Sequence, residues 1–259
     1  MLTLLEHRGP VAVVTLHSPE NRNALSRALM AELEECLFAL ERDPQVRVVV
    51  LAGGDEVFSS GADLKMLHGL GQASSEDNKN DSLRLAQLLE TMYTYPKPIV
   101  AALEGSAIAG GAGLASVCDI VVSSETAKMG YTEVRLGFVA ALVGVFLVRL
   151  VGQRRAKELL LTGKLISAEQ ALEWGLINAV VPKGQALEKA LEWAQDIAKQ
   201  SPTALAASKE VLAQIPGMGL GEALRYAAGV NAWIRTTDDL KEGVSAFLEK
   251  RPAQWKGLK

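Results

Sequence analysis

Hydrophobic residues along this chain are arranged in two ways, as short continuous runs and as longer segments with helical spacing. The continuous runs are rich in valine and isoleucine, which predicts β-strands. They cover residues 11–16 (VAVVTL), 46–53 (VRVVVLAG), 99–103 (IVAAL) and 119–123 (DIVVS). Runs of this kind are typical of strands buried on both faces, as in a parallel sheet flanked by helices.

The longer segments place apolar residues three or four positions apart, which is the spacing of one helix face. This spacing predicts helices over residues 26–42, 81–95, 187–200, 220–235 and 238–250. Strands and helices alternate through most of the chain, and helices alone fill its last part. The pattern predicts an α/β fold in two parts, a core over residues 1–195 and a helical region over residues 196–259.

Two segments depart from these patterns. Residues 69–80 are polar and rich in Gly, Ser, Asn and Asp, which predicts a mobile connection or a frayed helix. The most apolar run, residues 136–148, is shorter than the roughly 20 residues that span a bilayer, so we expect a buried helix there. The N-terminal residues carry charges at Glu6 and Arg8 and no long apolar region. We therefore expect no secretory signal and no membrane contact, and a cytoplasmic location.

Composition and charge exclude several classes of protein. The chain is 49% hydrophobic with a formal net charge of −3, so no basic excess indicates nucleic-acid binding. Cys36 and Cys118 form no CxxC motif, which indicates buried thiols in a reducing compartment. The histidines, His7, His17 and His68, lack the spacing of metal ligands, and no metal site is expected.

The first segment that could carry chemistry is residues 58–64, FSSGADL, between a buried strand and a helical stretch. Gly61 permits a backbone conformation that other residues resist. Asp63 is suited to cap the helix that follows. One interpretation is a capped turn with a purely structural role. The other is a backbone N–H, that of Ala62, directed into a pocket.

The second segment is residues 104–122, EGSAIAGGAGLASVCDIVV, where three glycines begin a short buried helix. The first N–H groups of a helix have no partners within the helix, and its dipole adds positive charge there. Glycines allow a ligand to approach these amides, so an oxygen that gains negative charge could bind at the Gly110 N–H. Close packing between the helix and a sheet is the alternative reason for the glycines.

The third segment, residues 128–137, reads KMGYTEVRLG and precedes the most apolar run of the chain. A carboxylate in such a place can be desolvated, which raises its proton affinity and suits a general base or acid. Glu133 is the candidate. A surface ion pair between Glu133 and Arg135 is the alternative.

Together, two N–H donors and one carboxylate match the needs of a particular reaction. A thioester carbonyl gains negative charge when a proton leaves its α-carbon or when water adds to its β-carbon. Two N–H groups stabilise the enolate oxygen, and a carboxylate moves the protons. Losing one such donor typically costs about 10²–10³ in rate.

These three segments, in this order and at these intervals, resemble the crotonase superfamily, the enoyl-CoA hydratase/isomerase family. The resemblance extends from VAVVTLHSPENRNALS to AFLEKRPAQW, essentially the whole chain. FSSGADLKML is similar to the family's first oxyanion segment, GSAIAGGAGLASVCDIVV to its second, and YTEVRLGFV to the segment of the catalytic acid. The resemblance implies a spiral of ββα turns and a helical region for trimer contacts, with two trimers often stacked into a hexamer.

The resemblance also implies roles for single residues. Ala62 and Gly110 match the two oxyanion amides, and Glu133 matches a catalytic glutamate. The residues that match the lining of the acyl-CoA channel are Ala62, Asp63, Leu64 and Lys65. Lys250 matches a basic residue that reaches the 3′-phosphate of coenzyme A, in some members from a neighbouring subunit, and Arg22 is a weaker candidate for a phosphate contact. No cofactor is implied, because coenzyme A is part of the substrate.

The sequence departs from the family at Gly113, where hydratases with two acids carry a second glutamate on the glycine-started helix. One carboxylate suffices to move a proton between C2 and C4, which is double-bond isomerisation. For hydration, Glu133 would have to deprotonate water and return that proton to the α-carbon. Members similar to methylglutaconyl-CoA hydratase resemble this chain in TEVRLGF, so we predict an enoyl-CoA hydratase of fatty-acid metabolism. An isomerase and a non-catalytic acyl-CoA-binding protein stay as alternatives.

Overall fold

The larger sheet of the molecule has six strands in the order β1-β2-β3-β5-β7-β10. The structure is a computed structural model that describes residues 1–71 and 73–257. The six strands are β1 (Thr3–Arg8), β2 (Val11–Leu16), β3 (Val48–Ala52), β5 (Ile99–Leu103), β7 (Ile120–Ser124) and β10 (Ala179–Val181). All neighbours are parallel except β1 and β2, which are antiparallel. Val50 pairs with Val13 on one side and with Val100 on the other, which fixes the central register.

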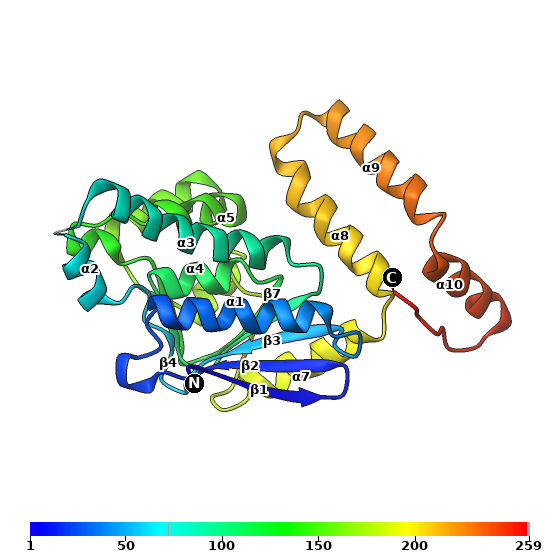
Figure 1. Cartoon of the computed structure of the whole chain (residues 1–259), viewed down its shortest axis with the longest axis horizontal. Coiled ribbons are helices and arrows are strands. Elements are labelled where there is room, and N and C mark those ends of the chain that lie inside the picture. The colour runs from blue at the N-terminus through cyan, green and yellow to red at the C-terminus, as the bar shows by residue number, and fades with distance from the viewer. Residues whose placement is uncertain (72, 258–259) are drawn as a thin grey trace.

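The central strands β2, β3, β5 and β7 are buried on both faces of this sheet, as their continuous apolar runs predict. Successive side chains of a strand point to opposite faces. Val14 and Leu51 belong to the core that α1 (Arg27–Arg42) shares, whereas Val13 and Val50 belong to a second core with α7 (Ala186–Ala198). In Figure 1 these two helices lie on opposite sides of the strands.

A smaller sheet holds the short strands β4, β6, β8 and β9 in that order. They span Val57–Ser59, Ser106–Ile108, Lys128–Gly130 and Ile166–Ser167. The first three are mutually parallel, and β9 is antiparallel to β8. The carboxyl ends of β4, β6 and β8 therefore lie at one edge of this sheet.

The chain repeats one path three times to build the two sheets. Each turn gives one strand to the larger sheet, the next strand to the smaller sheet, and then a helical segment. The helical segments are α2 (Leu64–Leu70) with α3 (Ser75–Thr94), then α4 (Gly110–Ser116), then the 3₁₀ turn η2 (Glu133–Leu136) with α5 (Ala141–Thr162). Between the third turn and β10 lies α6 (Ala168–Glu173). The path is the predicted spiral of ββα turns.

The last helices form an arm that projects from the body (Figure 1). They are α8 (Pro202–Gln214), α9 (Leu220–Ile234) and α10 (Asp238–Glu249). Ser201 caps α8 by accepting the Ala204 N–H at 3.1 Å, with proline at the first helical position. No residue of α9 is buried among those described, and Leu220 and Leu224 are exposed. The predicted boundary after residue 195 falls within α7, whose Ala198 still packs on the sheet.

Three sequence expectations need correction at the level of elements. The pattern does not predict β1, most of whose side chains are exposed at the edge of the sheet. We expect a mobile connection or a frayed helix over residues 69–80, of which Gln72 lies outside the described residues. In the structure α3 already begins at Ser75, because the Ser74 hydroxyl accepts the Asp77 N–H at 3.1 Å and caps the helix. Cys36 and Cys118 are free but only partly buried.

The apolar run 136–148 is not the buried helix that we expect from its composition. The helix begins at Ala141, and Leu136 and Val139 before it are 64% and 66% exposed. On the helix itself, Val143 and Leu147 pack into the core. The physical reason is that α5 rests on the body with one face only. None of the helices in the described part of the chain is long and apolar enough to cross a membrane.

Candidate active site

The three predicted segments leave neighbouring strands at the same sheet edge. Ala62 follows the end of β4, Gly110 follows β6, and Glu133 follows β8, each within three residues of the strand end. Because these strands are adjacent and parallel, their carboxyl ends lie side by side, which is where ligands bind in open α/β sheets. The topology therefore brings together the two amides and the acid.

The first bend directs the Ala62 N–H away from the protein's own acceptors. Gly61 has φ +86°, in the region that favours glycine, and its carbonyl accepts the Leu25 N–H at 2.7 Å. A trans peptide is planar, so its carbonyl and its N–H point in opposite directions. The Ala62 N–H thus points away from Leu25, and it donates to no residue within 1–71 or 73–257.

The second bend likewise directs the Gly110 N–H away from the acceptors of the protein. Ala109 has φ 52° and ψ −124°, a strained conformation for a residue with a side chain. Its N–H donates to the Gly130 carbonyl at 2.7 Å, and its own carbonyl accepts the Gly113 N–H at 3.1 Å. The Gly110 N–H consequently points away from Gly113, and no described residue accepts it.

The two bends are in contact with each other. A Cβ placed on Gly61 would lie only 2.8 Å from the Gly110 nitrogen, and one placed on Gly110 would lie 3.8 Å from the Ala62 nitrogen. Larger residues would separate the two amides. Close packing is also real, because a Cβ on Gly111 would lie 2.3 Å from the Ser59 carbonyl oxygen. Close packing, one of the two reasons that the sequence suggests for these glycines, is therefore present, and approach of a ligand to the amides stays a prediction.

Glu133 is desolvated, as its place before an apolar run predicts. The residue is 8% exposed, and burial raises the pKa of its carboxyl. Its Oε2 is buried and has no hydrogen-bond partner in the described part of the protein. The alternative ion pair with Arg135 does not form between these described residues. A carboxylate oxygen without a partner is free to accept a proton from a bound molecule.

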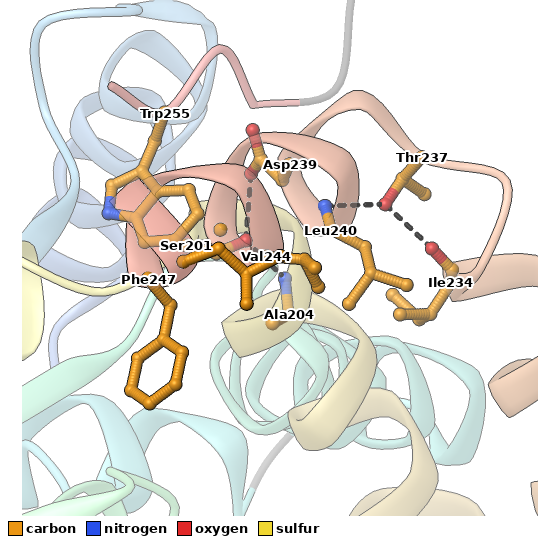
Figure 2. A pocket seen from close by; sticks show the side chains of 11 residues that line it. Ser201, Ala204, Ile234, Thr237, Asp239, Leu240, Val244, Phe247 and Trp255 are labelled. Atoms are coloured by element: carbon orange, nitrogen blue, oxygen red, sulfur yellow. Dashed lines mark hydrogen bonds between the residues drawn. The ribbon is translucent and has the colours of Figure 1, made fainter. Parts of the chain in front are cut away.

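Two hollows of the described surface lie elsewhere, in and beside the arm. Figure 2 shows one of about 350 Å³, lined by residues of α8 to α10 and by Trp255. The other, of about 650 Å³, is lined by Arg47, Lys199 and residues 252–255. Neither includes Ala62, Gly110 or Glu133. The candidate site is thus defined by unpaired amides and a buried acid. No group of three His, Cys, Asp or Glu side chains that could hold a metal occurs within 1–71 and 73–257.

Comparison with known proteins connects this geometry to a family. The sequence profile described as "Enoyl-CoA hydratase/isomerase" matches residues 6–258. The chain belongs to the enoyl-CoA hydratase/isomerase family. A relative from Thermus thermophilus is 53% identical over 248 residues, covering 96% of this chain and 98% of the relative. The Escherichia coli K12 protein named 2,3-dehydroadipyl-CoA hydratase is 36% identical over 255 residues, covering 98% of each chain.

A solved structure gives the same answer for the fold of this hydratase/isomerase family member. The crystal structure of an enoyl-CoA hydratase from Bacillus anthracis is similar with a TM-score of 0.92 and 33% identity, covering 100% of both chains. The predicted family, its crotonase-type fold and the prediction of an enzyme are confirmed.

Gly113 is the position where the resemblance places a second glutamate, and here its space is filled. A Cβ on Gly113 would lie 2.0 Å from Cγ1 of Val143 on α5. A side chain at residue 113 therefore requires Val143 to move. In this hydratase/isomerase, the missing second acid is accompanied by a valine packed against the bare backbone.

The structure places the remaining predicted site residues either beside the first bend or far from it. Arg22 lies beside the first bend, because its carbonyl accepts the Ser60 N–H at 3.1 Å. The Arg22 side chain is exposed. Asp63 caps α2, as predicted, by accepting the Lys65 N–H at 2.9 Å, and Leu64 and Lys65 are exposed.

Lys250 is not brought to this group within one chain. It follows α10, and Figure 1 shows α10 and α2 at opposite ends of the longest axis. The binding roles of Lys250, Arg22 and residues 62–65 stay predictions.

Sequence reasoning missed residues that hold the first bend in place. Asn23 is buried, and its side chain donates to the Phe58 carbonyl at 3.1 Å. Its own carbonyl accepts the Ser59 hydroxyl at 2.7 Å. A signal is present in the sequence, because PENRNALS is rich in asparagine, which tolerates the left-handed backbone that Asn23 adopts at φ 52°.

Proposed function

We propose that this enzyme adds water across the 2,3 double bond of an enoyl-CoA thioester. The observation that carries the proposal is the contact between the two bends at Ala62 and Gly110, whose amides have no partner within 1–71 and 73–257. Buried Glu133 follows a strand that ends at the same edge of the sheet. Two preorganised N–H donors favour an oxygen that gains negative charge during the reaction.

In the proposed mechanism, the thioester oxygen accepts one hydrogen bond from each of the two backbone N–H groups. Ionised Glu133 takes a proton from water while the water oxygen forms a bond to C3. The π electrons of the double bond move toward the carbonyl, which becomes the enolate. Protonated Glu133 then returns its proton to C2, the enolate collapses to the thioester, and the carboxylate is regenerated. Coenzyme A is part of the substrate, and the proposed chemistry uses no other cofactor.

A Δ-isomerase is the second candidate, and Gly113 favours it. With Val143 packed against residue 113, no second acid assists Glu133 from that position. A single carboxylate that removes a proton from one carbon and delivers it to another suffices for isomerisation. The hydratase is preferred because the Escherichia coli relative, 36% identical, is named as a hydratase, and we extend from it the hydration but not the acyl group.

For binding, we propose that Ala62, Asp63, Leu64 and Lys65 line the acyl-CoA channel with Gly110. Arg22 and Lys250 are proposed phosphate contacts. Because α10 lies far from α2 in one chain, Lys250 would serve a neighbouring subunit. A homotrimer or a dimer of trimers supplies such a neighbour, and the exposed apolar residues of α9 support that assembly. We further propose a cytoplasmic enzyme of fatty-acid metabolism that contacts neither membrane nor nucleic acid.

The test compares three proteins on crotonyl-CoA: wild type, Glu133→Gln, and Glu125→Gln as a matched change of an exposed glutamate. Hydration is followed as loss of the conjugated thioester absorbance. We expect Glu133→Gln to lower kcat by at least about 10²-fold and Glu125→Gln to leave it unchanged. An unchanged rate in Glu133→Gln would refute the assignment of the acid. Faster conjugation of a 3-enoyl-CoA than hydration of a 2-enoyl-CoA would establish the isomerase.

A further inference from the structure

A pair of buried hydroxyls connects the two structural elements that carry the acid and the second amide. Tyr131 is 1% exposed and Ser116 is 4% exposed. Their oxygens lie 2.7 Å apart, and the Ser116 hydroxyl donates to the Ala112 carbonyl at 2.8 Å. Because the Ser116 hydrogen is used in that bond, the Tyr131 hydroxyl is the donor to Ser116. The result is a series of two hydrogen bonds that runs from the Tyr131 hydroxyl, after the end of β8, through Ser116 to the Ala112 carbonyl in α4.

The hydrogen bond between Tyr131 and Ser116 is the second of two connections between α4 and the end of β8. At the start of α4, the Ala109 N–H donates to the Gly130 carbonyl at 2.7 Å. At its last residue, Ser116 accepts from Tyr131, which is the next residue along from Gly130. The two connections lie at either end of a seven-residue helix whose first residue is Gly110. Glu133 follows Tyr131 by two residues.

The carboxylate of Glu133 depends on its backbone for its position. Its Oε2 has no hydrogen-bond partner in the described protein, so no side-chain contact of that oxygen fixes it. Across residues 131–136, Tyr131 makes the one side-chain hydrogen bond found among the described residues. The backbone that leads into η2 is therefore tied to α4 by the Gly130 carbonyl and, through a side chain, by the Tyr131 hydroxyl.

We propose that Tyr131 and Ser116 are positioning residues, whose shared hydrogen bond sets the Glu133 carboxylate relative to the Gly110 amide. The proposal rests on the proposed roles of Glu133 and Gly110. Proton transfer requires the acid to lie within hydrogen-bond reach of the reacting carbon while the oxygen is held by the amide. A displacement of about 1 Å can lower a rate by as much as 10²-fold.

The experiment measures kcat and KM for crotonyl-CoA hydration in Tyr131→Phe, Ser116→Ala and the double variant. Tyr95→Phe is the matched control, because Tyr95 is 2% exposed and its hydroxyl donates to the Leu37 carbonyl at 2.5 Å, joining α3 to α1. Urea unfolding of each variant reports the loss of a buried hydroxyl. We expect about a tenfold lower kcat in each single variant, with KM within twofold, and no further loss in the double variant. The control should lose stability to a similar extent and keep its kcat.

Two outcomes would overturn the proposal. If Tyr131→Phe and Ser116→Ala keep wild-type kcat while losing stability as Tyr95→Phe does, the pair is merely structural. If the losses of kcat multiply in the double variant, the residues do not act through one shared bond. Failure of the proposed function is recognised separately, because Glu133→Gln would then retain activity, or the wild-type enzyme would isomerise a 3-enoyl-CoA faster than it hydrates a 2-enoyl-CoA. Should Ser116→Ala fail to fold, the Tyr131→Phe and Tyr95→Phe pair still decides between the two roles.

Discussion

Two buried carboxylates, one in the body and one in the arm, meet opposite surroundings. In the body, Glu133 is 8% exposed, its Oε2 has no partner among the described residues, and burial raises its pKa. In the arm, Asp239 is 2% exposed, and both of its oxygens accept hydrogen bonds, one of them from the Ser201 hydroxyl (Figure 2). Burial acts to raise the pKa of Asp239, but hydrogen bonds from Ser201 and from the Gly257 and Lys256 amides outweigh it and leave the pKa lowered.

The difference teaches how one type of side chain serves either structure or chemistry. Asp239 accepts the Ser201 hydroxyl at 2.7 Å and the Lys256 and Gly257 amides at 2.9 and 3.0 Å, so it joins α8, α10 and the C-terminal segment. A carboxylate whose acceptors are occupied has little left to offer a substrate. Glu133 keeps an acceptor free at the cost of desolvation, which is the state that a proton-transfer group requires.

Glycines differ between the two regions in the same sense. In α4 of the body, Gly113 is packed so closely that a Cβ would meet Val143 at 2.0 Å. In α9 of the arm, a Cβ on Gly229 would meet no atom within 4 Å. In the body, the absence of a side chain at Gly113 allows the backbone to approach Val143 closely. In the arm, no described atom lies close enough to Gly229 to require a glycine there.

The largest expected effect contrasts these two glycines. Gly113→Ala should lower the free energy of unfolding by about 2–3 kcal/mol through overpacking. Gly229→Ala should raise it by about 0.5–1 kcal/mol, because alanine is the better helix former. Urea unfolding checks both values. Adding Val143→Ala to Gly113→Ala should recover part of the loss, and equal stability of the two single variants would contradict the difference in packing.

Asp239→Asn should have the next largest effect, a loss of about 2–3 kcal/mol of stability at pH 7, because hydrogen bonds to a charged acceptor are replaced by weaker ones. The contribution of Asp239 is present above its unfolded pKa of about 3.8 and is lost as the pH falls through its lowered folded pKa. Thermal unfolding at pH 7 and at low pH measures it. A difference that grew on acidification would contradict the role given to this carboxylate.

Glu133→Gln should change stability in the opposite direction and by a smaller amount. A carboxyl whose folded pKa is raised stabilises the protein most below its unfolded pKa of about 4.5, and this contribution is lost as the pH rises through the folded pKa. Because glutamine does not ionise, the variant should unfold at a higher temperature than wild type at pH 7. The gap should close below about pH 4.5. A lower unfolding temperature at pH 7 would show that the charge of Glu133 is satisfied after all.

The central strands of the fold could be predicted from sequence because each buries two apolar faces. Val48 to Ala52 form such a run, and no polar residue interrupts it. Strand β1 could not be predicted, since its exposed edge imposes no pattern on its side chains. The start of α3 was hidden for another reason, because the cap at Ser74 stabilises a helix in a stretch whose composition indicates a loop.

The local pattern predicts residues of the candidate site singly, whereas their arrangement follows only from the family resemblance. Ala62, Gly110 and Glu133 each lie in a short segment with a local physical signal. Their convergence depends on β4, β6 and β8, which are three residues long and too short to show a strand period. Contacts between distant segments, such as Val143 on Gly113, leave no mark in the local pattern.

The most direct test of the central claim is a crystal structure with a saturated acyl-CoA, which keeps the thioester carbonyl but lacks the double bond. We predict that the carbonyl oxygen lies about 3 Å from both the Ala62 and the Gly110 nitrogens. The Glu133 carboxylate should face the C2 and C3 atoms of the acyl chain. A carbonyl oxygen held by side chains elsewhere, with both amides left unbound, would contradict the account.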